Sequence, residues 1–199
     1  MESNGGTSTP GGGGQTLPPN EFSHEKAWGV YGWGGSAASP FYRGIKGTNT
    51  TVLWSDLEPS EGDFRFDEVI GSRLEAFREK GMRTFLKIYI SPLSPEQYNS
   101  PRWLFEDKGV PIVEVTDSSD PFGEPLDWTY PWYLDETYRH YLHRMIRAFG
   151  QWLRELPEEL RETVLFVQVA EGCTSDGQAY KGTPLDARSR LTQESWLEY

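Results

Sequence analysis

The chain has 199 residues, of which 36% are hydrophobic and 25% charged, enough for one globular domain with a sizeable core. Its net charge of −11 argues against nucleic acid and anionic membrane surfaces as partners, and no apolar run approaches the roughly 20 residues of a membrane span. The single cysteine, Cys173, excludes an internal disulfide and a multi-thiolate metal site. The spacing of the histidines and carboxylates supports no other metal site, and we expect no cofactor.

Residues 1–22 are dominated by Gly, Ser, Thr, Pro and Asn and contain very few apolar side chains. Such a segment buries too little surface to offset its ordering entropy, which predicts a flexible leader. It lacks the apolar stretch of a signal peptide. By analogy with tethered proteins outside the cytoplasm, we expect a secreted, periplasmic or surface-anchored location. The globular part is expected to span residues 23–199.

Beyond the leader, strand-like and helix-like segments alternate along the chain. Strands are expected at residues 27–31, 48–54, 83–90 and 164–169. A short helix or turn is expected around residues 40–45. Helices are expected from an N-cap at Asp67 to Gly81, from an N-cap at Asp135 to Pro157, and from Gln193 onward. The last strand is a nearly continuous apolar run, which predicts burial on both faces.

This alternation predicts an α/β fold with a parallel sheet and right-handed crossovers. Four such units suit either a small open sheet or half of an eight-stranded barrel, and propensity alone does not separate the two. The residues that follow the strands therefore carry the rest of the argument.

A dense motif follows the second predicted strand: Trp-Ser-Asp-Leu-Glu-Pro-Ser-Glu-Gly-Asp-Phe-Arg-Phe-Asp, residues 54–67. Its proline and glycine bracket a tight turn, and its two phenylalanines suit the entry to the next helix. The pattern resembles the segment after the second strand of clan-A glycoside hydrolases, and the β-galactosidase-like glycoside hydrolase family 42 is the nearest comparison. Glu58 in this motif either braces the turn or binds substrate.

A carboxylate, Glu171, follows the apolar strand at residues 164–169. Burying an unpaired charge is costly, so a carboxylate at the end of a buried strand indicates a function for that side chain. An apolar environment raises the pKa of a carboxyl group, which suits a proton donor. The resemblance implies a (β/α)₈ TIM barrel of which this chain holds about the first four β/α units. It also implies that Glu171 is the acid/base of a retaining glycosidase whose nucleophile lies on the seventh strand, beyond residue 199. The family usually has Asn where this chain has Ala170.

Aromatic side chains are abundant, at 14% of the chain, and many lie in the long connection at residues 91–134. Trp and Tyr rings stack on the flat C–H faces of sugars, although they can equally attach a loop to the barrel rim. Lys87 and Tyr89 share one face of the third strand and either bind substrate or form a structural pair. The residues expected to bind a carbohydrate substrate are Trp33, Trp54, Glu58, Lys87, Tyr89, Trp132, Gln168 and Asp176.

Two other functions fit parts of the pattern. A non-catalytic carbohydrate-binding relative suits the missing Asn and the many aromatic rings. A different barrel enzyme, such as a lyase or aldolase, would use Lys87 to form a Schiff base. Under the glycosidase interpretation, residues 1–199 alone are expected to be inactive, and the remaining half of the barrel is the expected structural partner.

Overall fold

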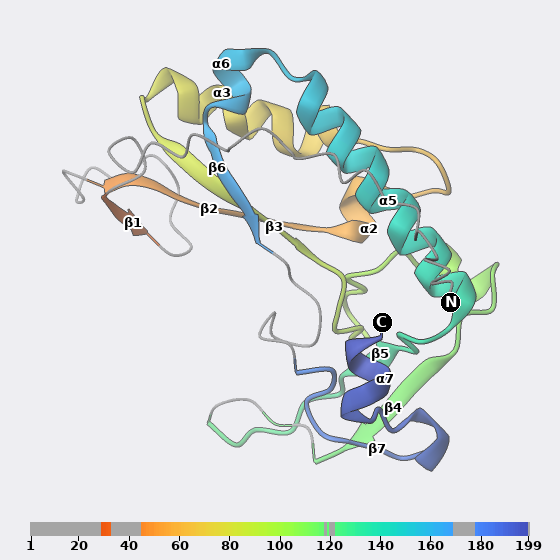
Figure 1. The fold of residues 1–199 in the computed structure, drawn as a ribbon. Helices are drawn as coiled ribbons and strands as arrows, with labels where there is room; N and C mark the ends of the chain where they lie inside the picture. Colours follow the sequence, from red (N-terminus) through yellow and green to blue (C-terminus); the bar gives the residue numbers. More distant parts are fainter. Residues whose placement is uncertain (1–28, 33–44, 118, 120–121, 169–177, 199) are drawn as a thin grey trace, which may run out of the picture.

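The fold in Figure 1 is a computed structural model that describes residues 29–32, 45–117, 119, 122–168 and 178–198. Its central element is a parallel sheet with the strand order β1-β2-β3-β6. These strands are β1 (Val30–Gly32), β2 (Ile45–Leu53), β3 (Arg83–Tyr89) and β6 (Val164–Gln168). The register sets Leu53 beside Tyr89 and Lys87 beside Gln168, so the carboxyl ends of β2, β3 and β6 lie at one edge of the sheet.

Threonines hold the centre of the sheet together. The hydroxyl groups of Thr50 and Thr84 lie 2.8 Å apart, and Thr84 Oγ1 donates to the carbonyl oxygen of Thr48 at 2.7 Å. All three side chains are buried, and the β-branched residue suits a pleated strand. Gly47 lets β2 approach β3 closely, because a Cβ at this position would collide with the carbonyl oxygen of Arg83.

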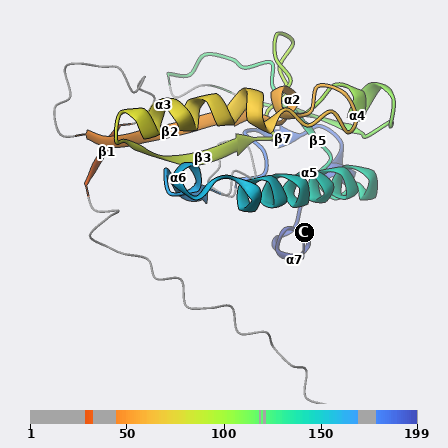
Figure 2. The ribbon, with the colours of Figure 1, turned by 90° about the horizontal axis from the view of Figure 1, so that it is seen from above.

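The helices that connect the parallel strands lie on the same face of the sheet (Figures 1 and 2). They are the π-helical turn η1 (Asp67–Gly71), α3 (Ser72–Glu79), α5 (Glu136–Glu155) and α6 (Glu158–Arg161). Val52 and Leu86 point from the sheet into the same buried core as Leu74 and Leu142 of the helices. Phe66 also contacts Phe149, with ring centroids 5.7 Å apart, which packs the β2–α3 connection against α5.

The connection from β3 to α5 contains a second layer of structure below the carboxyl ends of the parallel strands in Figure 1. Its strands form an antiparallel sheet with the order β5-β4-β7. The elements are α4 (Trp103–Glu106), β4 (Ile112–Thr116), β5 (Thr129–Pro131) and, from later in the chain, β7 (Thr183–Pro184). Three short helical segments complete the described part: α2 (Trp54–Leu57), the 3₁₀ turn η2 (Ala187–Ser189) and α7 (Gln193–Leu197).

An aromatic cluster joins the antiparallel sheet to the parallel one. Tyr133 contacts Tyr138, Tyr180 and Trp196, with ring centroids 6.1, 5.6 and 5.2 Å apart. Tyr138 in turn meets Trp54 at 5.8 Å. Because most of these rings are fully or nearly fully buried, much of the aromatic content is core material that attaches the long connection to the sheet.

Several expectations from the sequence are confirmed. The described fold is α/β with a parallel sheet, as predicted. Asp135 caps α5 by accepting a hydrogen bond from the amide of Tyr138 at 2.9 Å. Gly81 has a φ of +62° just after α3, the left-handed conformation expected of a glycine that ends a helix. Helix α7 begins at Gln193, as expected.

Other expectations are wrong. The strand at residues 164–169 is not buried on both faces, because β6 lies at the edge of the sheet and leaves Phe166 50% and Val167 41% exposed. Asp67 does not cap a helix, since it is the first residue of η1 and its carboxylate accepts a hydrogen bond from Trp152. Trp54 begins α2 instead of ending β2. Of the short helix or turn expected around residues 40–45, Ile45 is the first residue of strand β2, and the other residues lie outside the described ones, as does the leader.

We predict that Leu142→Ala lowers the free energy of unfolding by about 2–5 kcal/mol, because it opens a cavity in the core beneath α5. Leu142 is 2% exposed, whereas Ile146 on the same helix is 45% exposed. The matched Ile146→Ala variant should therefore change stability by roughly 0.5 kcal/mol or less. Urea denaturation of both variants checks this, and equal losses would contradict the placement of α5 on the sheet.

Candidate functional site

A row of polar side chains lies on the sheet face opposite the helices. Because side chains alternate along a strand, Thr51 and Lys87 point away from the face that carries Val52 and Leu86. The register extends the row to Gln168 on β6, and Tyr89 and Asn49 follow at two-residue spacing. We call Asn49, Thr51, Lys87, Tyr89 and Gln168 the polar row. It ends at the edge where the carboxyl ends of β2, β3 and β6 meet.

Contacts within the polar row order its side chains. Asn49 Nδ2 donates to Thr51 Oγ1 at 2.8 Å. The ammonium group of Lys87 lies 4.5 Å from the centre of the Tyr89 ring, a cation–π contact, and Lys87 is only 2% exposed. The row therefore places amide and hydroxyl groups along one face, groups that can hydrogen-bond a ligand with many hydroxyl groups, whereas Lys87 is buried within the row.

The carboxylate of Glu58 is buried in the turn that follows β2. It accepts hydrogen bonds from Trp54 Nε1 at 3.0 Å and from the amide of Gly62 at 2.8 Å, and it forms an ion pair with Arg144 of α5. The indole of Trp103 donates to the backbone carbonyl of Glu58 at 3.2 Å. Glu58 and Trp54 are both completely buried, so they brace this turn and have no surface that a ligand could reach.

Arg144 is the centre of the same network on the α5 side. Its guanidinium lies 4.7 Å from the Tyr141 ring centre and 5.7 Å from that of Trp103. Glu61, the second glutamate of the motif, accepts from Tyr141 at 2.8 Å and pairs with Lys108 at 2.6 Å and with Arg144 at 3.5 Å. Hydrogen bonds from Lys108 and Tyr141 lower the pKa of Glu61, and the same carboxylate raises the pKa of Lys108. The motif thus ties the carboxyl end of β2 to α5.

A groove of about 540 Å³ opens where the loops after β2 and β3 meet. The two loops are held side by side by a hydrogen bond of 2.9 Å from the Ser55 amide to the Asn99 carbonyl. The groove is lined by Leu53, Ser55, Asp56, Pro59, Glu96, Gln97, Tyr98, Pro101 and Arg102. It thus places two carboxylates near a guanidinium that lies 4.1 Å from the centre of the Tyr98 ring.

Sequence reasoning did not select Asp56, Glu96 or Arg102 for this edge of the sheet. Asp56 stands in α2, and Glu96 and Arg102 stand in the connection after β3; no motif links the two segments, and the pairing of β2 with β3 brings them to one groove. The sole signal in the sequence was their position directly after predicted strands, where ligand-binding residues of parallel sheets collect.

The residues predicted to bind substrate do not all lie at one site in the structure. Lys87, Tyr89 and Gln168 lie together in the polar row. Trp54 and Glu58 are buried beneath the turn, and Trp132 lines a separate groove on the antiparallel sheet. The predicted acid/base Glu171 and the predicted binding residues Trp33 and Asp176 lie outside the described residues.

Within the described ranges, no three His, Cys, Asp or Glu side chains gather in a way that could hold a metal ion. In that same part of the chain, none of the helices combines the length and the apolar character needed to cross a membrane.

No protein-family model matches the sequence, and a comparison with curated proteins gives no significant match.

We predict that Arg144→Ala lowers the free energy of unfolding by about 3–5 kcal/mol, because it leaves the carboxylate of Glu58 buried and without its counter-charge. Adding Glu58→Gln to this variant should recover part of the loss, since the neutral amide is cheaper to bury. Denaturant unfolding of the single and double variants measures both effects.

Arg147→Ala is the matched control, because Arg147 is an exposed arginine one turn further along α5. It should unfold at nearly the same denaturant concentration as the unmodified chain. If Arg144→Ala and Arg147→Ala behave alike, Arg144 does not brace the turn after β2.

Proposed function

We propose that this chain belongs to a retaining glycoside hydrolase of clan A and forms about the first four β/α units of a (β/α)₈ barrel. The observation that carries the proposal is the arrangement of the parallel sheet. Its strands follow one another in chain order, their connecting helices cover one face, and a polar row lies on the other face at the carboxyl edge.

Sequential order favours a barrel over a doubly wound sheet. In a doubly wound sheet the strand order reverses and helices cover both faces, whereas in a (β/α)₈ barrel each strand pairs with the next and every helix lies outside. Here α3 and α5 share one face and the opposite face carries the polar row. The open edge at β6, with Phe166 and Val167 exposed, is where a following strand of such a barrel would pair.

The proposed chemistry uses two carboxylates on either side of a glycosidic bond, about 5–5.5 Å apart. In the sequence, Glu171 comes three residues after Gln168, the last residue of β6, and it is proposed as the acid/base. It would protonate the leaving oxygen and then activate water, while a nucleophile beyond residue 199 forms the covalent glycosyl intermediate. Tyr89 and Gln168 would hydrogen-bond the hydroxyl groups of the bound sugar, and the buried Lys87 would hold the Tyr89 ring in place.

Substituting Glu171 in the protein expressed from its complete gene tests the proposed acid/base role directly. Glu171→Gln should lower kcat/KM on polysaccharides by about 10²–10⁴-fold, because it removes the proton donor. Aryl β-glycosides with good leaving groups need little acid assistance, so their rate of glycosylation should fall far less. Comparing the two substrate classes measures the role of the side chain.

Glu162→Gln is the matched control, since Glu162 is an exposed carboxylate just before the amino end of the same strand. It should leave both activities unchanged. If neither the unmodified protein nor Glu171→Gln cleaves any glycan, but both bind one equally, the chain is a carbohydrate-binding relative instead of an enzyme. If borohydride traps a carbonyl substrate on Lys87, the chain belongs to a Schiff-base enzyme and the glycosidase proposal fails.

A further inference from the structure

A second groove, of about 420 Å³, lies on the antiparallel sheet. Its walls come from three segments that are far apart in the sequence: β4, the residue after β5 and the loop after β7. Backbone hydrogen bonds fix these segments to one another, from Trp132 to Pro111 at 2.9 Å and from Leu185 to Glu114 at 3.0 Å. The groove is therefore formed by paired backbone, and its volume lies within the range of small-molecule sites.

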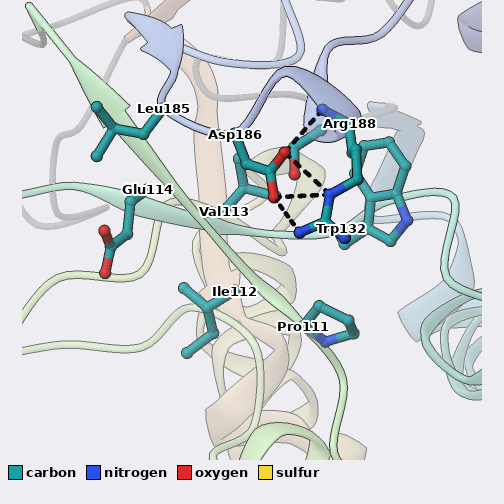
Figure 3. A pocket seen from close by; sticks show the side chains of 9 residues that line it. Pro111, Ile112, Val113, Glu114, Trp132, Leu185, Asp186 and Arg188 are labelled. Carbon is teal, nitrogen blue, oxygen red and sulfur yellow. Dashed lines mark hydrogen bonds and ion pairs between the residues drawn. The ribbon is translucent and has the colours of Figure 1, made fainter.

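One end of the groove carries a solvent-exposed ion pair beside an aromatic ring. Figure 3 shows Asp186 and Arg188 gathered near Trp132. Arg188 Nε lies 3.1 and 3.0 Å from the two carboxylate oxygens of Asp186, and Nη2 lies 2.6 Å from Oδ2. Hydrogen bonds from Arg188 lower the pKa of Asp186 to about 2, so this carboxylate remains an acceptor at ordinary pH.

The rest of the groove combines apolar surface with one more carboxylate. Ile112 and Leu185 are large exposed apolar residues of the described chain, and Glu114 lies toward the end of the groove opposite Trp132 (Figure 3). A ligand that fits must present a flat apolar surface to Trp132 and several hydroxyl groups to the charged side chains. Pyranose rings have this combination.

The charges of the groove favour an uncharged ligand. Glu114 and Asp186 contribute two negative charges and Arg188 one positive charge, which disfavours a strongly anionic sugar or phosphate. The groove also shares no residue with the polar row or with the groove between the β2 and β3 loops. A ligand in it would be held away from those residues, on a separate sheet.

We propose that this groove is an outlying carbohydrate-binding site, which holds one or two uncharged sugar residues of a longer glycan on Trp132 between Arg188 and Glu114. The inference rests on the proposed function for the choice of glycan, but the binding itself needs no catalysis. Trp132, predicted from the sequence to touch substrate, acts in this site, and the site would raise the affinity for long glycans over short ones by adding a second attachment point.

Affinity electrophoresis in gels that contain soluble galactomannan or mixed-linkage β-glucan tests the site. All variants carry Glu171→Gln as well, so that the glycans stay intact during the measurement. Arg188→Ala and Glu114→Gln should each weaken binding about tenfold, since each removes a charged hydrogen-bonding group. Both residues are exposed at the surface, so neither change threatens folding. Arg190→Ala is the control, because Arg190 is an exposed arginine of the same loop that does not line the groove, and it should bind like the parent.

The outcomes separate this inference from the proposed function. If the unmodified protein hydrolyses aryl glycosides but Arg188→Ala and Glu114→Gln bind the glycans as the parent does, the groove is no sugar site and the glycosidase proposal stands. If no substrate is hydrolysed and both variants still lose glycan binding while Arg190→Ala does not, the sugar site stands and the enzyme proposal fails. Failure of the parent to bind any glycan would overturn the inference.

Discussion

The completely buried carboxylate of Glu58 links the turn after β2 to helix α5. A buried charge is tolerated only where hydrogen bonds and a counter-charge replace water, and here an indole, a backbone amide and Arg144 do so. The partners come from the turn after β2 and from α5. The ion pair therefore fixes α5 relative to the carboxyl end of β2, and with it the edge of the sheet where the proposed site lies.

Aromatic packing then attaches the antiparallel sheet to this frame. Trp54 hydrogen-bonds Glu58 and also contacts Tyr138, from which the cluster continues through Tyr133 to Tyr180 and Trp196. Tyr133, like the other rings of the connection at residues 91–134, was expected from the sequence either to bind sugars or to attach that connection, and in this cluster it attaches it. The aromatic abundance of the described chain is thus in large part structural, whereas Trp132 and Tyr98 line grooves.

The two candidate binding surfaces differ in origin. The polar row depends on the alternation of side chains along adjacent parallel strands, so its residues stay on one face wherever the register holds. The groove on the antiparallel sheet depends on three distant segments that meet through backbone pairing. In the proposed glycosidase the first surface would orient the sugar near the reacting bond and the second would hold the remainder of the chain.

The sequence by itself determined the features that arise from local periodicity and backbone conformation. The alternation of strands and helices predicted the parallel sheet, Asp135 marked the start of α5, and Gly81 marked the end of α3, because caps and left-handed glycines act within a few residues. The shared face of Lys87 and Tyr89 followed from two-residue spacing. Tertiary structure alone decided the edge position of β6, the burial of Trp54 and Glu58, and the meeting of Trp132 with Arg188. These depend on which distant segments pack together, and such contacts leave no periodic trace in the chain.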